Sequence, residues 1–280
     1  MHPVYVHIKK ELSPFYAEEE ASAMAKWISS DILHLSTLEL YTGKDMNFST
    51  KEWEELEDIL RRLKQREPLQ YILQEASFCG RSFHVEQGVL IPRPETEELV
   101  EWIVSDYREA GQVRILDIGT GSGCIPVSLA QLLPEAQVSS CDVSAEALRI
   151  AAMNVKRYGD KVTLFCADIL KEELPECQVD VLVSNPPYIT ESERTDMEAN
   201  VLDWEPELAL FVPDSDPLRF YRRIARKGLD WLSEGGTLYF EINRAYGVET
   251  VRMLEELGYR QIELRKDLSG NDRMIKAIRP

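Results

Sequence analysis

Along the first 75 residues, apolar side chains recur three and four positions apart, and this spacing predicts amphipathic helices. We expect one helix to begin at Ser13, with Pro14 at its first helical position. The apolar residues between Met24 and Leu35 continue the helical spacing. Residues 1–75 are therefore predicted to form a small all-α N-terminal domain.

A second helix start is marked more clearly. Ser49 and Glu52 stand three residues apart, as in a capping box, where each side chain bonds the backbone N–H of the other residue. Phe48 and Trp53 occupy the two positions of a hydrophobic staple. We expect this helix to end before Pro68 and to serve packing and docking, because the region contains no cluster of ligand-like side chains.

The helical spacing of apolar residues ends before Phe78. Strand-forming residues between Phe78 and Ile91 are interrupted by Gly80 and Gly88, a pattern that favours a β-hairpin. We therefore expect a hairpin linker at residues 76–92, joining the helical domain to the rest of the chain.

Between residues 93 and 280, short apolar runs alternate with helical spacings. Such alternation predicts βαβ units and a mostly parallel sheet with helices on both faces. The last two strands are separated only by the turn Ser269–Asp272, so they must pair antiparallel. The predicted strands are Val113–Ile118, Gln137–Val143, Val162–Ala167, Val179–Val183, Thr237–Ile242, Gln261–Lys266 and Met274–Ile278.

This order of elements places the chain in the α/β class, with a Rossmann-like sheet that ends in a C-terminal antiparallel hairpin. A parallel sheet finished in this way is typical of S-adenosylmethionine methyltransferases, more than of dinucleotide-binding enzymes. Residues 93–280 are therefore predicted to form an S-adenosylmethionine-dependent methyltransferase domain.

Composition narrows the function classes. The chain has 280 residues, 44% of them hydrophobic and 29% charged, which fits a globular protein with a sizeable core. We expect a cytoplasmic protein without membrane contact, because no apolar run approaches roughly 20 residues and no signal-peptide stretch is present. The formal net charge of −17 argues against direct nucleic-acid binding, which depends on Lys and Arg contacts to phosphate.

The five cysteines are odd in number, widely spaced and form no C-x-x-C pair, and the four histidines are scattered. We therefore expect no metal site. Thiols within apolar stretches act as small buried hydrophobes.

A glycine-rich stretch follows the first predicted strand of the sheet. It has the form D-x-G-x-G-x-G, whereas the dinucleotide fingerprint G-x-G-x-x-G would require glycine where Cys124 stands. Glycines allow the backbone to turn tightly and approach a ligand, and a following helix offers free N–H groups to a carboxylate. The expected cofactor-binding residues are Asp117, Gly119, Thr120, Gly121, Ser122 and Gly123.

Two acidic residues stand at the ends of the next two predicted strands. Asp142 lies about 20 residues after the loop, where a carboxylate can accept both ribose hydroxyls. Asp168 closes the third strand, in position to meet an adenine amino group with Ile169 against the ring. Either acid alone also fits a solvated strand end or a helix cap, but both at consecutive strand ends favour a nucleoside site.

The tetrad Asn185-Pro186-Pro187-Tyr188 follows the fourth strand and is predicted to carry the chemistry. An amide or amino nitrogen needs its N–H groups oriented by acceptors so that its lone pair points at a methyl donor. The Asn185 side-chain oxygen and the Pro186 carbonyl supply two acceptors, and the two prolines hold that carbonyl in place. Tyr188 offers a flat face to a planar amide. No strong base is required, because preorganised acceptors stabilise the charge that develops on nitrogen.

With these motifs, the chain resembles the bacterial N5-glutamine methyltransferases of peptide chain release factors along nearly its whole length. The resemblance implies that the helical domain docks the substrate, that S-adenosylmethionine is the cofactor and S-adenosylhomocysteine its product, and that Asn185 contacts both cofactor and glutamine. It also implies substrate contacts for Arg93 and Glu95. The matching segments are Gln70–Ile72, Phe78 with Gly80 and Phe83, Ile91–Glu97, Asp117–Gly123, Asn185–Tyr188, Glu205–Pro206 with Ala209–Leu210, and Asp267–Gly270 with Arg273.

Release factors are therefore the expected protein partners, with the enzyme acting as a monomer. The glutamine of their Gly-Gly-Gln motif is the expected acceptor. The alternatives are a glutamine methyltransferase of a large-subunit ribosomal protein, a DNA adenine-N6 methyltransferase, whose tetrad is similar, and a binding protein with a vestigial fold. No DNA-recognition domain or basic surface bias supports the DNA reading.

Two segments depart from the family pattern. Phe211–Pro217 replaces a glycine-rich turn, and Asn243 follows Glu241-Ile242 where a glycine and a glutamine are common. A third feature is a row of arginines at helical spacing, which we interpret as a solvated helix face in preference to a docking stripe. The row consists of Arg219, Arg222, Arg223 and Arg226.

Overall fold

The computed structural model divides into two compact units. It describes residues 1–43, 48–171 and 177–280. The first unit consists of Met1–Leu73 with Ala199–Trp204, and the second of Gln74–Glu198 with Glu205–Pro280.

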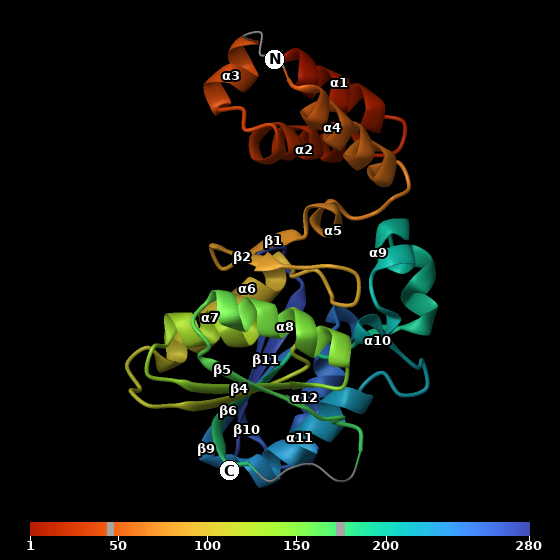
Figure 1. Ribbon diagram of the computed structural model, residues 1–280. Helices are drawn as coiled ribbons and strands as arrows, with labels where there is room; N and C mark the ends of the chain where they lie inside the picture. Colours follow the sequence, from red (N-terminus) through yellow and green to blue (C-terminus); the bar gives the residue numbers. More distant parts are fainter. Residues whose placement is uncertain (44–47, 172–176) are drawn as a thin grey trace. The chain divides into compact units, whose positions relative to one another are not determined.

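The first unit is helical (Figure 1). Its helices enclose an apolar core to which Ile8, Leu12, Ile28 and Leu60 contribute fully buried side chains. The elements are α1 (Pro3–Leu12), α2 (Glu18–Trp27), the π-helical turn Ile28–Ile32, α3 (Thr37–Thr42), α4 (Thr50–Leu63), α5 (Leu69–Leu73) and the later α9 (Ala199–Trp204).

The predicted capping box at the start of α4 is confirmed. The Ser49 hydroxyl accepts a hydrogen bond from the Glu52 backbone N–H, and the Glu52 carboxylate accepts one from Ser49 N at 2.6 Å. The Phe48 and Trp53 rings of the staple meet edge to face with centroids 5.8 Å apart. The helix ends at Leu63, before Pro68 as expected.

The helix start predicted at Ser13 is wrong. Ser13 is the C-cap of α1, and its hydroxyl donates to the Lys9 carbonyl at 2.7 Å. A serine hydroxyl can bond the carbonyl four residues earlier as readily as it caps a helix start. The helix that precedes Ser13, α1, has Pro3 at its first position and the His2 side chain as cap, and the helix that follows it, α2, begins at Glu18.

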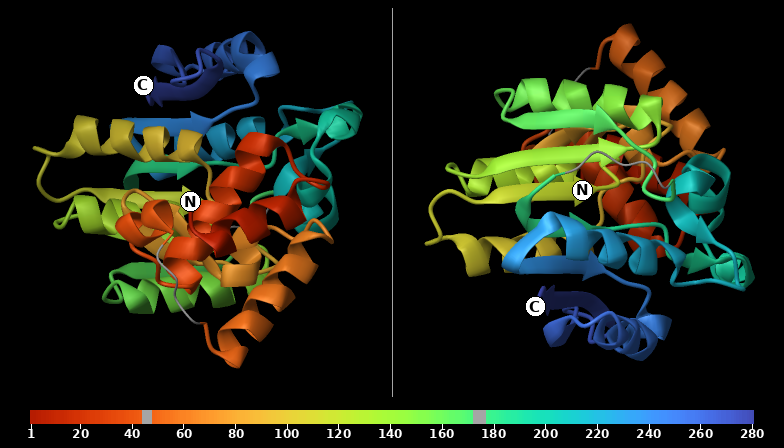
Figure 2. Two further views of the ribbon diagram at one scale, coloured as in Figure 1. Left: turned by 90° about the horizontal axis from the view of Figure 1, so that it is seen from above. Right: turned by 90° about the horizontal axis from the view of Figure 1, so that it is seen from below.

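The second unit contains a seven-stranded mixed sheet of order β10-β11-β9-β6-β3-β4-β5. The five strands from β9 to β5 run parallel, and the predicted antiparallel pairing of the last two strands is confirmed. β5 and β10 form opposite edges of the sheet (Figure 2). The strands are β3 (Arg114–Ile118), β4 (Gln137–Asp142), β5 (Val162–Cys166), β6 (Val179–Ser184), β9 (Leu232–Glu241), β10 (Arg260–Lys266) and β11 (Asp272–Ile278).

Helices cover both faces of this sheet, so that α7 and α8 lie on one side and α11 on the other (Figure 1). Neighbouring residues of one strand serve opposite cores, as Ile115 and Leu116 show. This alternation follows from the two-residue period of a strand. The helices are α6 (Pro94–Tyr107), α7 (Cys124–Leu132), α8 (Ala145–Arg157), α11 (Arg219–Trp231) and α12 (Gly247–Glu256).

The hairpin expected between the two parts belongs to the second unit. Its strands are β1 (Glu75–Phe78) and β2 (Arg81–His84), paired antiparallel. Phe78 and Phe83 are fully buried in the core shared with α6 and α7, and their rings meet edge to face at 6.0 Å.

Several short elements were not expected from the sequence. β7 (Ile189–Thr190) follows the Asn-Pro-Pro-Tyr segment and pairs in parallel with β8 (Phe211–Val212). The divergent segment Phe211–Pro217 therefore begins with a short strand, which pairs with the residues that directly follow Tyr188. The other short elements are the 3₁₀ turns Glu191–Asp196 and Arg244–Tyr246 and the helix α10 (Glu207–Leu210).

Among the described residues, no helix has the length and apolar character needed to cross a bilayer.

Replacement of Ser49 by alanine should destabilise α4 by about 1 kcal/mol, because an N-cap hydrogen bond is lost. Hydrogen exchange of the α4 amides in the full chain measures the change. The neighbouring exposed Thr50, replaced by alanine, is the control. Equal exchange in both variants would show that the capping box contributes nothing.

Candidate active site

A cavity of about 290 Å³ opens at the carboxyl ends of the parallel strands. In an open α/β sheet this edge is where ligands bind. The cavity is lined by residues that follow β3, β4, β5 and β6 and by the segment before α6. Of the residues predicted from sequence, it brings together Arg93, Gly119, Thr120, Gly121, Ser122, Asp142, Asp168, Ile169, Asn185, Pro186 and Pro187.

Four predicted residues do not line the cavity. Asp117 stands at the start of the glycine loop and Gly123 at its end, Glu95 lies in the first turn of α6, and Tyr188 is the last residue of the tetrad and bonds Glu241.

The glycine loop is fixed against the end of β4. The amides of Gly119 and Thr120 both donate to the Cys141 carbonyl, at 2.8 and 3.1 Å. Gly119 and Gly123 have φ values of +89° and +83°, which favour glycine. A Cβ on Gly123 would lie 3.2 Å from the Ala151 Cβ of α8, so a glycine is also needed for close packing.

Asp117 is buried at the base of the loop, with none of its surface exposed. Its Oδ2 accepts a hydrogen bond from the Ser140 hydroxyl at 2.5 Å. Burial raises the pKa of Asp117 to about 8, although the Ser140 bond works in the opposite direction. The Asp117 carboxyl group bonds Ser140 of β4 and does not line the cavity.

Asp142, the last residue of β4, faces the cavity. Its Oδ2 accepts from Gly121 N at 3.0 Å and its Oδ1 from Ser144 N at 2.9 Å. Each carboxylate oxygen has two lone pairs, so both keep one for a ligand hydroxyl. Two backbone amides thereby orient the acid across the cavity floor.

Asp168 and Ile169 follow β5 and form another part of the wall. Asp168 Oδ1 accepts from Leu170 N at 3.0 Å, which fixes the turn. Arg223 of α11 donates from Nε to the Ile169 carbonyl at 2.8 Å and also bonds the Lys171 carbonyl.

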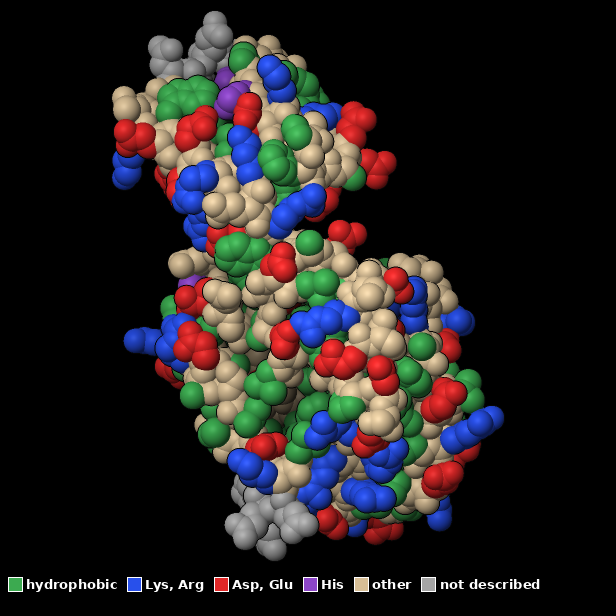
Figure 3. Space-filling model, turned by 90° about the vertical axis from the view of Figure 1, so that its right-hand side faces the viewer, with side chains coloured by type: hydrophobic (Ala, Val, Ile, Leu, Met, Phe, Trp, Pro, Cys, Tyr) green, Lys and Arg blue, Asp and Glu red, His purple; other side chains and the backbone are tan. Residues whose placement is uncertain are grey.

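The row of arginines on α11 is therefore more than a solvated face. Arg223 holds the loop after β5, and Arg222 pairs with Asp216 at 2.8 Å. Lys and Arg side chains gather in one area of the face of the second unit drawn in Figure 3. The interpretation of the row as solvent-exposed charge needs this correction, since a guanidinium can satisfy loop carbonyls.

The Asn-Pro-Pro-Tyr segment leaves β6 at the cavity. Asn185 Nδ2 donates to the Thr96 hydroxyl at 3.2 Å. Within the described chain, no group donates to Asn185 Oδ1 or to the Pro186 carbonyl. Two acceptors of the kind predicted from sequence are thus available in residues that line the cavity.

A buried carboxylate lies behind this segment. Glu241, at the end of β9, is 1% exposed and accepts from the Thr96 hydroxyl at 2.6 Å and from the Tyr188 hydroxyl at 3.0 Å. Burial raises the pKa of Glu241, while those two hydrogen bonds and the Arg273 charge lower it. Burial, and then the Glu241 charge, raise the pKa of Tyr188.

Asn243 has a clear role despite its departure from the family pattern. Its Nδ2 donates to the Tyr188 carbonyl at 3.1 Å and to the Glu193 carboxylate at 2.9 Å. Its own backbone N–H donates to the Tyr221 hydroxyl at 3.2 Å. The tyrosine of the tetrad is therefore held at both its backbone and its hydroxyl.

Arg93 and Glu205 fasten the wall formed by the segment before α6. Arg93 Nη2 lies 2.5 Å from Glu205 Oε1, and Glu205 Oε2 accepts from Ile91 N at 3.1 Å. The Glu205 side chain is almost completely buried, so the ion pair is a fixed part of the wall. The guanidinium of Arg93 is partly committed to this contact.

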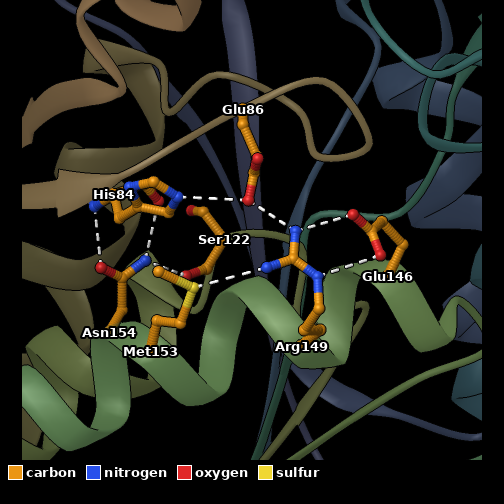
Figure 4. A network of polar contacts seen from close by, with 7 residues as sticks. All are labelled: His84, Glu86, Ser122, Glu146, Arg149, Met153 and Asn154. Atoms are coloured by element: carbon orange, nitrogen blue, oxygen red, sulfur yellow. Dashed lines mark hydrogen bonds and ion pairs between the residues drawn. The ribbon is translucent and has the colours of Figure 1, made fainter.

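Asn154 of α8 connects the hairpin with the glycine loop (Figure 4). Its Oδ1 accepts from His84 N at 2.8 Å, and its Nδ2 donates to the carbonyls of His84 and Ser122 at 2.9 and 2.8 Å. Beside it, Arg149 bonds both Glu86 and Glu146. The Asn154 side chain is fully buried, and its three bonds satisfy two backbone groups of His84 and the buried Ser122 carbonyl.

Two cysteines, Cys124 and Cys141, also line the cavity. Burial raises the pKa of each thiol to about 12. Among the described residues, no group of three or more His, Cys, Asp or Glu side chains is arranged to hold a metal ion.

Sequence reasoning assigned no role to Thr96, Asn154 or Glu241. Asn154 and Glu241 lie within otherwise apolar stretches of a helix and a strand, which is the one signal that marks them. A polar residue in a buried stretch requires partners, but a sequence does not show which partners these are.

Known proteins match the chain over its whole length. A family model described as "PrmC N-terminal domain" matches residues 5–73, and one described as "Methyltransferase small domain" matches residues 96–203. A protein of Bacteroides thetaiotaomicron named "Release factor glutamine methyltransferase" is 50% identical over 280 residues, which cover 100% of both chains.

The chain belongs to the release factor glutamine methyltransferase family. It is therefore an enzyme that transfers methyl groups, as the sequence predicted.

Solved structures agree with the methyltransferase fold of this family. The catalytic domain of hMettl16, in complex with an RNA hairpin, has a TM-score of 0.57 at 16% identity and covers 84% of this chain and 83% of its own. The Thermus thermophilus 16S rRNA methyltransferase RsmC, in complex with AdoMet and guanosine, has a TM-score of 0.53 at 17% identity. That match covers 74% of this chain and 50% of the other. At such identities the likeness concerns the fold alone.

Replacement of Asn154 by alanine should release the glycine loop. The variant loses the bond to the Ser122 carbonyl, and a buried group without a partner costs about 1–3 kcal/mol. Hydrogen exchange at the amides of Gly119 to Gly123 should therefore rise by about tenfold or more.

Tyr158→Phe is the matched control. Tyr158 bonds the hairpin at the Ser82 carbonyl, at 2.7 Å, without touching the loop. Equal exchange of the loop amides in the two variants would contradict the assigned connection.

Proposed function

We propose that the protein transfers a methyl group from S-adenosylmethionine to the side-chain amide nitrogen of a glutamine, in the Gly-Gly-Gln motif of peptide chain release factors. The observation that carries this proposal is the pair of unoccupied acceptors at the cavity, Asn185 Oδ1 and the Pro186 carbonyl. A primary carboxamide has two N–H donors, which matches two acceptors.

The polar and apolar groups that line the cavity fit S-adenosylmethionine. The backbone of the glycine loop and the start of α7 suit an amino acid carboxylate, and Asp142 keeps lone pairs for two ribose hydroxyls. Asp168 and Ile169 supply an acceptor and an apolar surface for adenine. The bound cofactor supplies a methyl group on a positively charged sulfur.

The acceptor nitrogen is activated by orientation. Its lone pair is delocalised into the amide carbonyl, so it reacts only when its N–H groups are held and the lone pair points at the methyl carbon. Asn185 and Pro186 supply these contacts, and the charge that develops on nitrogen strengthens them. Pro187 lines the cavity beside the planar amide, and Tyr188 supports this segment through its bond to Glu241.

The partner and the location are part of the proposal. We propose that release factors bind through the helical first unit, that the enzyme acts as a monomer in the cytoplasm, and that it contacts no nucleic acid directly. The family model for the first unit and the net charge of −17 support this reading. Arg93 and Glu95 would act near the substrate, Arg93 through the wall it forms with Glu205.

The substrate can be tested directly. A purified, unmodified release factor incubated with the enzyme and S-adenosylmethionine should gain one methyl group on the glutamine of its Gly-Gly-Gln motif. Tandem mass spectrometry locates the group, and a release factor with alanine in place of that glutamine is the control. Methylation of a ribosomal protein or of DNA adenine, with the release factor unchanged, would transfer the assignment to one of the alternatives.

Asn185→Ala should lower the rate of methyl transfer by about 10²-fold or more, the order found when one preorganised group is removed from an active site. Affinity for S-adenosylmethionine, measured by calorimetry, should change far less. A variant that keeps near-normal turnover would remove Asn185 from the mechanism.

A further inference from the structure

Glu241 and Thr96 form a chain of hydrogen bonds that ends at Asn185. Glu241 lies at the carboxyl end of β9, and Thr96 lies in the first turn of α6. Both side chains are buried, at 1% and 3% exposure. The carboxylate accepts from Thr96 Oγ1 at 2.6 Å, and that same oxygen accepts from Asn185 Nδ2 at 3.2 Å.

The direction of each bond in this chain is determined by the carboxylate. Both Glu241 oxygens accept in the structure, Oε1 from the Tyr188 hydroxyl and Oε2 from Thr96, as those of an acceptor-only carboxylate do. The Thr96 hydroxyl thus donates to Glu241. Its single proton is then used, and Thr96 can only accept from its next neighbour. The atom of Asn185 that faces Thr96 must therefore be the nitrogen, which leaves the amide oxygen for the cavity.

We propose that Thr96 and Glu241 are positioning residues for methyl transfer, which hold the Asn185 amide with its oxygen toward the acceptor nitrogen. The inference rests on the proposed function. Without this chain, the Asn185 amide could rotate by half a turn and present its NH₂ group to the substrate amide. Two donors would then face each other, and the acceptor nitrogen would lose one of its two contacts.

The second oxygen of Glu241 gives the chain another branch. Tyr188 donates its hydroxyl to Oε1 at 3.0 Å, so one carboxylate holds two members of the tetrad. Both neighbours are donors, and only an acceptor-only group satisfies both. A glutamine at this position would turn its NH₂ group toward either Thr96 or Tyr188, and that hydroxyl would have to find another acceptor.

Thr96→Val tests this chain of hydrogen bonds with almost no change in the shape of the side chain. It removes the hydroxyl, and we expect the single-turnover rate at saturating cofactor and release factor to fall by about tenfold or more, since small misplacement of an active-site group has effects of this order. Thr96→Ser retains the hydroxyl and should stay within about threefold of the unaltered enzyme. Glu241→Gln should lower the rate as Thr96→Val does, with cofactor affinity retained in all three variants.

A second measurement does not depend on activity. The side-chain NH₂ of Asn185, assigned in nitrogen NMR spectra by its absence from Asn185→Asp, should lose protection from exchange in Thr96→Val and keep it in Thr96→Ser. Rates and spectra unchanged by Thr96→Val would overturn the proposal while leaving the proposed function intact. If the unaltered enzyme fails to methylate release factors, the proposed function fails, and the NMR result alone decides whether the chain orients Asn185.

Discussion

Parallel pairing of β9, β6, β3, β4 and β5 is the constraint on which the active site depends. Because these strands point the same way, everything that follows them reaches one edge of the sheet. Glu241, Asn185, Gly119 and Asp142 are far apart in the sequence, yet each ends or follows one of these strands. No single segment could bring a cofactor loop, an acceptor site and a buried carboxylate together in this way.

Side chains from elements outside the sheet then hold the loops and residues at this edge in their orientation. The hairpin strand β2 and the glycine loop are joined by Asn154 of α8, and the loop after β5 is held by Arg223 of α11. The first turn of α6 contributes Thr96. Asn154 and Arg223 thus bond loop carbonyls directly and tie the loops around the cavity to the covering helices.

The sequence was sufficient for the parts that obey a local rule. The capping box at Ser49, the order of strands and helices in the second unit and the final antiparallel hairpin follow from spacing alone. Ser13 was misassigned because serine suits both ends of a helix. The link from Glu241 through Thr96 to Asn185 joins positions 145 and 89 residues apart, and only tertiary structure decides such pairs.

The two thiols in the cavity wall have a chemical consequence. A thiolate is a far stronger nucleophile than an amide nitrogen and would compete for an electrophilic methyl group. Burial raises the pKa of Cys124 and of Cys141 to about 12, so both thiols are protonated at neutral pH. The apolar packing that stabilises the sheet thereby also keeps these two thiols in their weakly nucleophilic, protonated form.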